Sequence, residues 1–558
     1  MAGTTRRRDW LFASLRDYNP AWLSGDLVAA TTLAAIAIPE QLATARLAGM
    51  PPMSGLFAFA AGTFGFAAFG ANRFISVGAD STIAPIMAGA LVALAVPGVV
   101  QYGTMAALLA LLAGLILVLA RIVRAGWIAD LLSIPVTTGF LAGISIHIIV
   151  GQLPSIMGID AIHGNLMERL ADVVGRARHF HAFPLAIGVG VLMLSQIAER
   201  WNPRIPGALI GLVVSALAVK LLALDQHGVA VLGALPIAPP ALTLTLPSWD
   251  DLTQLLPAAL IVALVCMMQT AAVARSFPSD PAGNEDVSGD FAGIGAGCIL
   301  AALFGAFAVN SSPPRTAVVH ESGGRSQLSG LFAIAIVSAI VLVASSAFAF
   351  VPEAALSGVL VFIAMRIFRV ATMRQIYRKG EWEILIVVAS AALVVLLPIE
   401  TGVTLSIVLS LLHGVYIIAR PDIAELSRIP GTTIWWTQGK GTPEEHEPGV
   451  LVIAPSAPIY FVNATYLRAR LMNAIAAQQE PCHYVVIEAH GVIDIDFTGS
   501  LILQQVIAEL RGRDIDVAIA RMSSERAQEA ARKTGLLDAL GEDHLFRSVE
   551  EAIRKRPA

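Results

Sequence analysis

The sequence predicts an all-α membrane protein of fourteen transmembrane segments, in two inverted repeats of seven, followed by a soluble α/β domain. Its composition is too apolar for an ordinary soluble chain, since 56% of the 558 residues are hydrophobic and 14% are charged. Apolar runs of about twenty residues recur along most of the chain, and a run of that length can cross a bilayer. Near the C-terminus the pattern changes to short apolar runs that alternate with amphipathic stretches.

The chain begins with a polar segment, residues 1–25, in which Trp10 and Trp22 predict a cytoplasmic stretch that lies on the membrane surface. No short apolar run with a cleavage site follows, so no signal peptide is expected. Residues 26–421 form the predicted transmembrane domain. The fourteen expected segments are residues 27–47, 53–70, 74–96, 103–122, 127–152, 182–199, 206–224, 252–274, 290–308, 309–322, 327–350, 352–367, 382–398 and 400–418.

Basic residues gather near alternate ends of these segments, as the positive-inside rule requires for a cytoplasmic N-terminus. An even number of segments returns the C-terminus to the same side. We therefore expect a multi-pass protein of the cell inner (plasma) membrane with both termini and the soluble domain in the cytoplasm. The polar loop 225–251 separates seven segments from seven, which suits two inverted repeats.

The stretch 304–317, FGAFAVNSSPPRTA, cannot be a membrane helix throughout. Its apolar part runs into Asn310, Ser311 and Ser312, then two prolines and Arg315. Non-helical backbone at bilayer depth is tolerated only where it is buried in protein or lines a wet cavity. We expect a short extended run that ends at Asn310 or Ser311, followed by a half-helix. The N-terminus of such a half-helix carries about half a positive charge and, with Arg315, attracts an anion.

An earlier stretch, residues 69–85, has the same order of features. It reads FGANRFISVGADSTIAP, looks extended at 74–77, breaks at Gly78 and resumes as a helix through residues 81–83. A pair of interrupted segments in corresponding halves of a transporter points to its substrate site. We therefore expect Asp80 and the two residues after it to face the later half-helix across one cavity.

The composition changes again after residue 421. Residues 422–448 are polar and contain several glycines, which predicts a linker. Residues 449–558 alternate like one compact α/β domain, with strands at 450–454, 485–488 and 517–520, a helix at 499–511 and further helices from 523 and 549. Neither GxGxxG nor a Walker pattern is present, so no nucleotide cofactor is expected.

Several classes of function are not supported by the sequence. The net charge of −4 gives no reason to expect a nucleic-acid partner. The three cysteines stand far apart without CxxC or Cys/His spacing, so neither a metal site nor a disulfide framework is expected. No nucleophile, base and orienting residue occur at a recognisable spacing, so an enzyme is not expected.

Through the motifs at 69–85 and 304–317, and through others given below, the chain resembles the sulfate permease (SulP) family, whose animal members include prestin and pendrin. IPEQLATARLAGMPPMSGLF at 38–57 is similar to the first-span signature of the family, SVGADS at 76–81 to its third span, and SIPVTTGFLAGISIHI at 133–148 to its fifth. Residues 314–317 stand at its SRTA motif. The C-terminal region resembles the STAS domain, shared with bacterial anti-sigma-factor antagonists, through IDFTGS at 495–500.

The resemblance implies a core domain and a gate domain, the gate comprising segments 5 to 7 and 12 to 14. It also implies an anion between the N-termini of segments 3 and 10, an elevator-type movement of the core, and a homodimer. The implied function is secondary active transport of sulfate or a similar small oxyanion or carboxylate. Two alternatives stay open: an anion channel, and an anion-sensing membrane anchor that signals through its STAS domain to an unknown cytoplasmic partner.

The substrate-binding candidates are Glu40, Thr44, Asp80, Ser81, Thr82, Gln269, Ser311, Ser312, Pro314, Arg315 and Thr316. Arg315 stands where the family places its cation, and its alternative is a structural ion pair. The family commonly has an apolar residue at position 80 and a glutamine at position 40. This chain has Asp80 and Glu40 there instead. A carboxylate beside an anion site repels the substrate unless it is protonated, so Glu40 is a candidate for proton-coupled symport. The alternative for Glu40 is a hydrogen bond to a neighbouring helix break.

Other departures from the family concern the pocket itself. Gln269 stands where relatives often have a carboxylate used for proton or sodium coupling, which makes sodium coupling less expected. Thr44 replaces an aromatic wall and predicts a roomier pocket. Pro313 and Pro314 replace Phe and Ser and remove two backbone donors.

In the STAS domain Thr498 stands at the position that is phosphorylated in the antagonists. Its alternative is a helix N-cap with Asp496 nearby.

Overall fold

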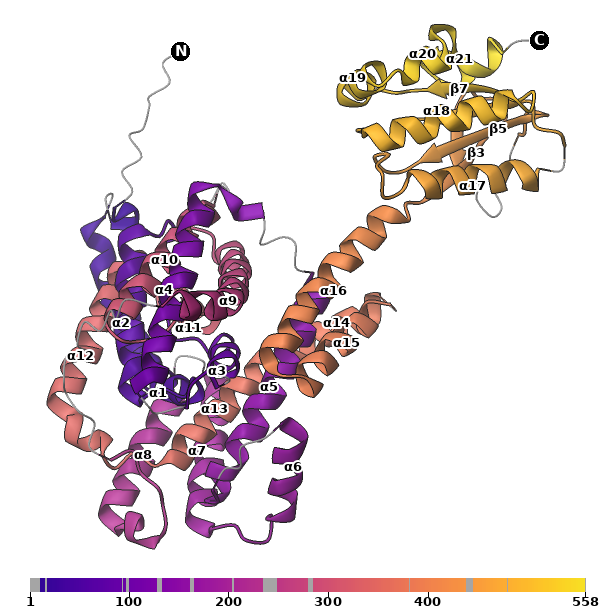
Figure 1. Cartoon of the computed structure of the whole chain (residues 1–558). Coiled ribbons are helices and arrows are strands. Elements are labelled where there is room, and N and C mark those ends of the chain that lie inside the picture. The colour runs from indigo at the N-terminus through magenta and orange to yellow at the C-terminus, as the bar shows by residue number, and fades with distance from the viewer. Residues whose placement is uncertain are drawn as a thin grey trace. The chain divides into compact units, whose positions relative to one another are not determined.

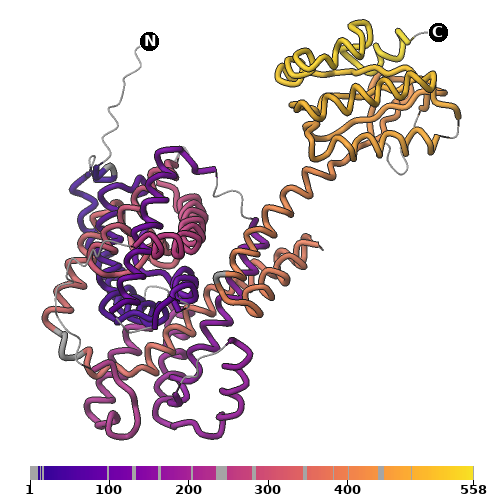
Figure 2. Tube along the Cα trace, viewed as in Figure 1, coloured from indigo at the N-terminus to yellow at the C-terminus, as the bar shows by residue number. Residues whose placement is uncertain are grey.

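The computed structural model describes residues 11–15, 18–92, 94–96, 100–127, 133–160, 165–202, 205–233, 248–279, 285–380, 382–437, 445–478 and 480–556. The chain divides into two compact units, one up to Ser410 and one from Leu411 (Figure 1). Figure 2 traces the chain through both.

The first unit is helical, and its elements correspond to the predicted membrane segments. Its α-helices are α1 (Leu23–Leu47), α2 (Pro52–Phe69), α3 (Ala84–Val92), α4 (Val100–Ile122), α5 (Ile134–Met157), α6 (Leu166–Gly175), α7 (Ala182–Trp201), α8 (Gly207–Leu222), α9 (Trp249–Ser276), α10 (Val287–Leu303), α11 (Pro313–Glu321), α12 (Leu328–Phe348), α13 (Glu353–Ile367), α14 (Val370–Lys379), α15 (Glu383–Leu396) and α16 (Ile399–Ala419), the last of which continues into the second unit. The 3₁₀ helices are η1 (Ala13–Leu15), η2 (Pro20–Trp22) and η4 (Leu224–His227).

Eight helices among the described residues are long and apolar enough to span a bilayer. Shorter apolar helices, α8, α10, α12 and α15, and the half-helices α3 and α11 account for the other predicted segments. Two further helices, α6 and α14, are amphipathic and were not predicted. The fifth segment begins later than its prediction of 127–152, because Ser133 accepts a hydrogen bond from the backbone N–H of Val136 and caps a helix that starts at Ile134.

The two interrupted segments meet inside this unit. Strand β1 (Val77–Gly78) pairs antiparallel with strand β2 (Asn310–Ser311). The predicted extended run and half-helix are confirmed, with Pro313 at the start of α11, where a missing N–H would have no helical partner anyway. After β1, residues 81–83 form a turn and α3 begins only at Ala84, slightly later than predicted.

Side chains from other helices satisfy the backbone of β1 and its neighbours. The side chain of Gln41 receives a hydrogen bond from the N–H of Ala79 at 2.7 Å and donates to its carbonyl at 3.0 Å. The hydroxyl of Thr63 donates to the carbonyl of Val77 at 2.8 Å. The amide of Gln327 donates to the carbonyl of Ile75 at 3.0 Å. Buried backbone groups in hydrocarbon have no water to bond to, so these polar side chains make the broken segments tolerable.

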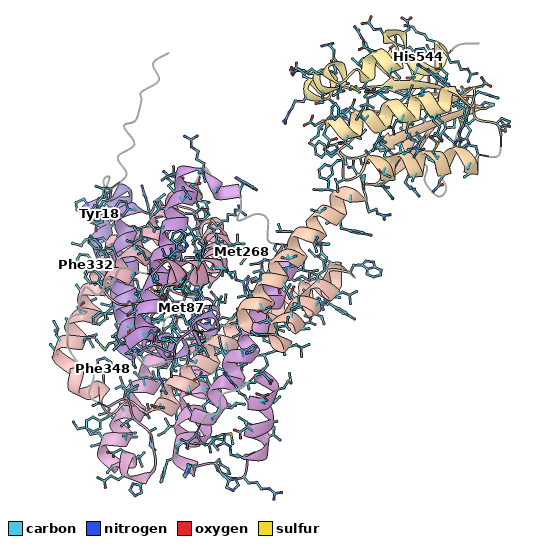
Figure 3. All side chains as sticks on the ribbon, in the orientation of Figure 1. Tyr18, Met87, Met268, Phe332, Phe348 and His544 are labelled. Atoms are coloured by element: carbon cyan, nitrogen blue, oxygen red, sulfur yellow. The ribbon has the colours of Figure 1, made fainter. Side chains whose placement is uncertain are left out.

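Glycines allow close approach of the helices around the paired strands β1 and β2, which we call the crossing. Helix α10 packs against both α2 and α4. A Cβ atom on Gly65 of α2 would lie 2.4 Å from the backbone nitrogen of Gly297 in α10, and one on Gly297 would lie 2.9 Å from the Cα of Gly62. Small residues at such contacts are the usual means of packing helices in a membrane. Met87 of α3 and Met268 of α9 lie in the interior of the same unit (Figure 3).

The second unit contains a six-stranded sheet with strand order β4-β3-β5-β6-β7-β8. Strands β5 to β8 run parallel, and β3 is antiparallel to both of its neighbours. Side chains of β6 are buried on both faces, because Val485 packs among the α17 and α18 residues and Val486 packs against the α21 residues. The elements are β3 (Ile423–Arg428), β4 (Trp435–Thr437), β5 (Val450–Pro455), α17 (Ala464–Ala477), β6 (Tyr484–Glu488), α18 (Phe497–Arg511), β7 (Asp516–Ala520), α19 (Glu525–Lys533), α20 (Leu536–Leu540), η5 (Glu542–His544), β8 (Leu545–Phe546) and α21 (Val549–Arg554).

The structure differs here from the predicted linker 422–448. Strands β3 and β4 lie within that range, and Ile423 of β3 pairs with Pro455 of β5. The polar composition misled the prediction because β3 lies near one edge of the sheet, where most of its side chains are only partly buried. The sheet therefore begins at Ile423.

The glycine contact gives a testable prediction. Gly65→Val places a branched side chain against the backbone of α10, which cannot yield as a side chain would. We expect a loss of about 1–3 kcal/mol in the free energy of unfolding, measured as a lower thermal midpoint of the purified protein in detergent. Gly190→Val on α7 is the matched control, because a Cβ there meets no atom within 4 Å. Equal midpoints for the two variants would contradict the prediction.

Candidate functional site

A cavity of about 430 Å³ lies beside the β1–β2 crossing. Residues from α1, α5, α9, α11 and α13 and from the turn between β1 and α3 enclose it. Its size suits a small ligand. The lining residues are Glu40, Asp80, Ser81, Thr82, Leu141, Gln269, Ser276, Phe277, Ser312, Pro313, Pro314, Ala317, Ile363, Arg366, Ile367 and Arg369.

Asp80 organises the turn that leads into α3. Its carboxylate accepts a hydrogen bond from the backbone N–H of Thr82 at 2.9 Å and lies in contact with the hydroxyl of Thr82. The backbone carbonyl of Asp80 accepts a hydrogen bond from the N–H of Ala84 at 3.1 Å. Asp80 therefore acts as a helix cap as well as presenting a carboxylate to the cavity. Ser81, which follows it, is buried and also lines the cavity.

Gln269 of α9 connects the two broken segments. Its amide nitrogen donates to the carbonyl of Ser311 at 2.8 Å and to the carboxylate of Asp80 at 3.3 Å. Its amide oxygen accepts from the hydroxyl of Thr82 at 2.8 Å. A carboxylate at position 269 could make neither donation and would face Asp80 with a second negative charge. The two departures noted in the sequence, Asp80 and Gln269, thus form one hydrogen-bonded pair.

Arg315 of α11 is fully buried and forms an ion pair with Glu40 of α1. Its Nη1 lies 2.5 Å from the Oε1 of Glu40 and donates to the carbonyl of Ala79 at 3.2 Å. Its Nε and Nη2 have no hydrogen-bond partner among the described residues. Glu40 lines the cavity whereas Arg315 lies behind it. The ion pair considered as the alternative for Arg315 is therefore present, and it leaves part of the guanidinium without a partner.

Four of the predicted ligands lie outside the cavity lining: Thr44, Ser311, Arg315 and Thr316. The hydroxyl of Thr316 accepts from the N–H of Ser76 at 3.1 Å, and that of Ser311 lies 3.2 Å from the hydroxyl of Thr270. These two side chains hold the crossing together. Thr44 is buried and its hydroxyl has no partner among the described residues. The assignment of all four as substrate ligands stays a prediction, as it does for the predicted residues that line the cavity.

The structure adds two arginines that the sequence interpretation did not assign to the site. Arg366 and Arg369, at the end of α13 and just after it, line the cavity. Arg366 pairs with Glu199 of α7 at 3.0 Å. In the sequence these two arginines stand three residues apart near the end of a predicted segment, which indicates the cytoplasmic side of the membrane but not a place in the cavity. Two carboxylates and two guanidinium groups thus line the cavity, and Arg315 adds a third cation behind them.

No group of three or more His, Cys, Asp or Glu side chains within the described part of the chain is arranged to hold a metal ion.

In the second unit Thr498 is the second residue of α18 and is exposed. The cap of this helix is Asp496, whose carboxylate accepts from the N–H of Gly499 at 2.7 Å. The hydroxyl of Thr498 is therefore not used as the cap, and its phosphorylation stays a prediction.

Both units of the chain contain regions that match known protein families. Residues 23–390 match the sulfate permease family, and residues 443–552 match the STAS domain. A protein of Mycobacterium tuberculosis (strain CDC 1551 / Oshkosh) named "Probable sulfate transporter" is 32% identical over 539 residues, which cover 97% of this chain and 96% of that protein. The chloroplastic sulfate transporter 4.1 of Arabidopsis thaliana is 25% identical over 573 residues, which cover 98% of this chain and 83% of that protein.

Solved structures show the same fold at low identity. The murine anion transporter Solute Carrier 26 family member A9, in its inward-facing state, superposes with a TM-score of 0.87 at 18% identity, over 98% of this chain and 93% of that chain. The transmembrane domain of the cyanobacterium bicarbonate transporter BicA gives a TM-score of 0.61 at 21% identity, over 71% of this chain and 98% of that chain. The predicted fold class is confirmed.

The buried ion pair gives a second testable prediction. Glu40→Gln or Arg315→Gln alone leaves one buried charge without its counter-ion, which costs about 3 kcal/mol of unfolding free energy. The double variant is expected to lose less unfolding free energy than the two single variants lose together, and the difference is expected to exceed about 1 kcal/mol. The unfolding free energies of the purified wild-type protein, the two single variants and the double variant give this coupling.

The control cycle uses the partly exposed pair Glu199 and Arg366, for which the coupling is expected to be about 0–1 kcal/mol. Additive effects at Glu40 and Arg315 would mean that the two charges do not depend on each other.

Proposed function

The chain belongs to the sulfate permease family, and we propose that it is a secondary active transporter that moves sulfate or a similar small oxyanion or carboxylate across the membrane. Members of this family are anion transporters with membrane-spanning helices. The observation that carries the proposal is the cavity beside the β1–β2 crossing, where hydroxyl groups, the turn before α3 and the first turn of α11 lie close to Arg315, Arg366 and Arg369.

Substrate recognition in this proposal depends mainly on side chains. Pro313 and Pro314 have no backbone N–H, and the N–H of Thr316 already donates to the carbonyl of Ser312 at 2.9 Å. The start of α11 therefore offers few backbone donors to an anion. The hydroxyl groups of Ser81 and Ser312, with the positive end of each half-helix, supply the binding contacts instead.

Proton coupling follows from the position of Glu40. While Glu40 is ionised, it neutralises Arg315 and presents a negative charge to the cavity. When Glu40 takes up a proton, Arg315 loses its counter-ion and the cavity becomes more positive. A bound anion then stabilises the protonated state, and the proton stabilises the bound anion by the same amount. This reciprocity is the thermodynamic basis of proton–anion symport.

An elevator-type movement suits the way in which the cavity is built. Glu40, Asp80, Gln269 and Ser312 come from the proposed core, α1 to α4 and α9 to α12. Leu141 and the α13 residues come from the proposed gate. A site at the boundary of two groups of helices can be exposed to either side if one group moves past the other. A homodimer in the inner membrane with both termini in the cytoplasm remains part of the proposal.

The function is tested with purified protein in proteoliposomes. We expect uptake of labelled sulfate, accelerated when unlabelled sulfate is present inside, because a carrier returns faster when loaded. A flux without this acceleration would favour a channel. No flux above that of empty liposomes, with sulfate, bicarbonate, oxalate or fumarate under any gradient, would favour the anion-sensing anchor.

Proton coupling is tested by Glu40→Gln. We expect the wild-type protein to take up sulfate faster when the outside is acidic, and the variant to show a ratio of about one with and without the pH gradient. Glu383→Gln, at the exposed start of α15, is the matched control and retains the wild-type ratio. A full pH response in the Glu40 variant would make Glu40 structural.

A further inference from the structure

A second cavity, of about 500 Å³, lies along α3, whereas the first cavity is lined by the turn that precedes this helix. It is lined by Arg46, Leu47, Pro85, Ala88, Gly89, Val92, His147, Ile148, Gly151, Gln152, Asn165, Leu166, Arg169, Val395, Leu396, Leu397, Pro398 and Ile399. Residue 46 follows Glu40 on α1 by a rise of about 9 Å. The second cavity therefore lies toward the end of α1, whereas the first is closed by residues at the ends of α9 and α13.

The charges that line this cavity are of one sign. Arg46 and Arg169 are its charged residues, and none of its described lining residues is acidic. Glu353 of α13 faces Arg46 from outside the lining, 2.6 Å from its Nη2. The Nη1 of Arg46 and the Nε of Arg169 are buried without a hydrogen-bond partner among the described residues. Buried N–H groups of this kind are normally paired, so each arginine has one nitrogen that lacks an acceptor among the described residues.

Neutral polar groups complete the lining. The Nε2 of His147 lies 2.8 Å from the carbonyl of Val394, so the other ring nitrogen is free of that bond. The amide oxygen of Gln152 accepts from the hydroxyl of Ser357 at 3.0 Å, which leaves its NH₂ group available as a donor. A Cβ on Gly151 would meet no atom within 4 Å, so the backbone of α5 faces open space here.

We propose that this cavity is a second anion site, in which Arg46 and Arg169 bind a small soluble oxyanion. Two guanidinium groups with unused N–H donors match an oxyanion with several acceptor oxygens. The idea that this site captures the transported anion rests on the proposed function. The binding of an anion by the two arginines does not. An anion on Arg46 also competes with Glu353 for the same guanidinium, and so weakens an ion pair that joins α1 to α13.

The test uses full-length Gly151→Cys protein in which Cys482 is replaced by serine. The two remaining cysteines, Cys266 and Cys298, are fully buried. Rates of reaction with an anionic and a cationic methanethiosulfonate reagent are measured by mass spectrometry and divided by the rates with a free thiol. We expect the corrected ratio to favour the anionic reagent by at least about fivefold. We also expect sulfate, at constant ionic strength, to slow the reaction.

Arg169→Gln removes one of the two cations and is expected to lower the ratio by about fivefold and to abolish protection by sulfate. Arg178→Gln is the matched control, because it makes the same change at an exposed position outside the cavity and leaves both results unaltered.

A corrected ratio near one, no protection by sulfate, or equal effects of the two variants would overturn the proposal. Nanodiscs with and without phosphatidylglycerol test a lipid headgroup as the ligand, and protection by that lipid alone would also overturn it. The assay needs no transport. Inactive protein with a protected thiol would contradict the proposed function and leave this site in place.

Discussion

The backbone of the two broken segments has to be satisfied inside the protein, because the bilayer supplies no hydrogen-bonding water. The short β1–β2 pairing satisfies part of it. Polar side chains satisfy much of the rest, with Gln41 and Thr63 on the β1 side and Gln269 on the carbonyl of Ser311. Each of these bonds fixes a helix against the crossing. The arrangement of α1, α2 and α9 around the crossing therefore follows from one requirement.

A second requirement, that a buried charge has a counter-ion, determines the charges at and behind the cavity. Arg315 cannot stay buried without a counter-ion, and Glu40 supplies it. Asp80 is held by hydrogen bonds from Thr82 and Gln269. The site thus combines a neutralised cation with a hydrogen-bonded carboxylate. In such a site the proton affinity and the anion affinity depend on each other, which links the packing of the crossing to the proposed coupled transport.

Much of the fold could be predicted from the sequence, since long apolar runs and interrupted segments are local signals. The half-helix at Pro313 followed from three polar residues and two prolines. The pair between Glu40 and Arg315 could not be predicted as a contact, because 275 positions separate the partners and no local pattern links them. Ser311 and Thr316 belonged to the right segment, but which side chain faces a cavity depends on packing. The strand β3 was missed because its partly buried side chains look like those of a linker.

Anomalous diffraction from crystals soaked in selenate tests whether an oxyanion binds beside the crossing, because selenate has the shape and charge of sulfate and selenium can be located by its own signal. We predict a selenium peak in the cavity beside the crossing, within hydrogen-bonding reach of Ser81, Thr82 or Ser312. Absence of a peak there at a concentration that saturates uptake would contradict it.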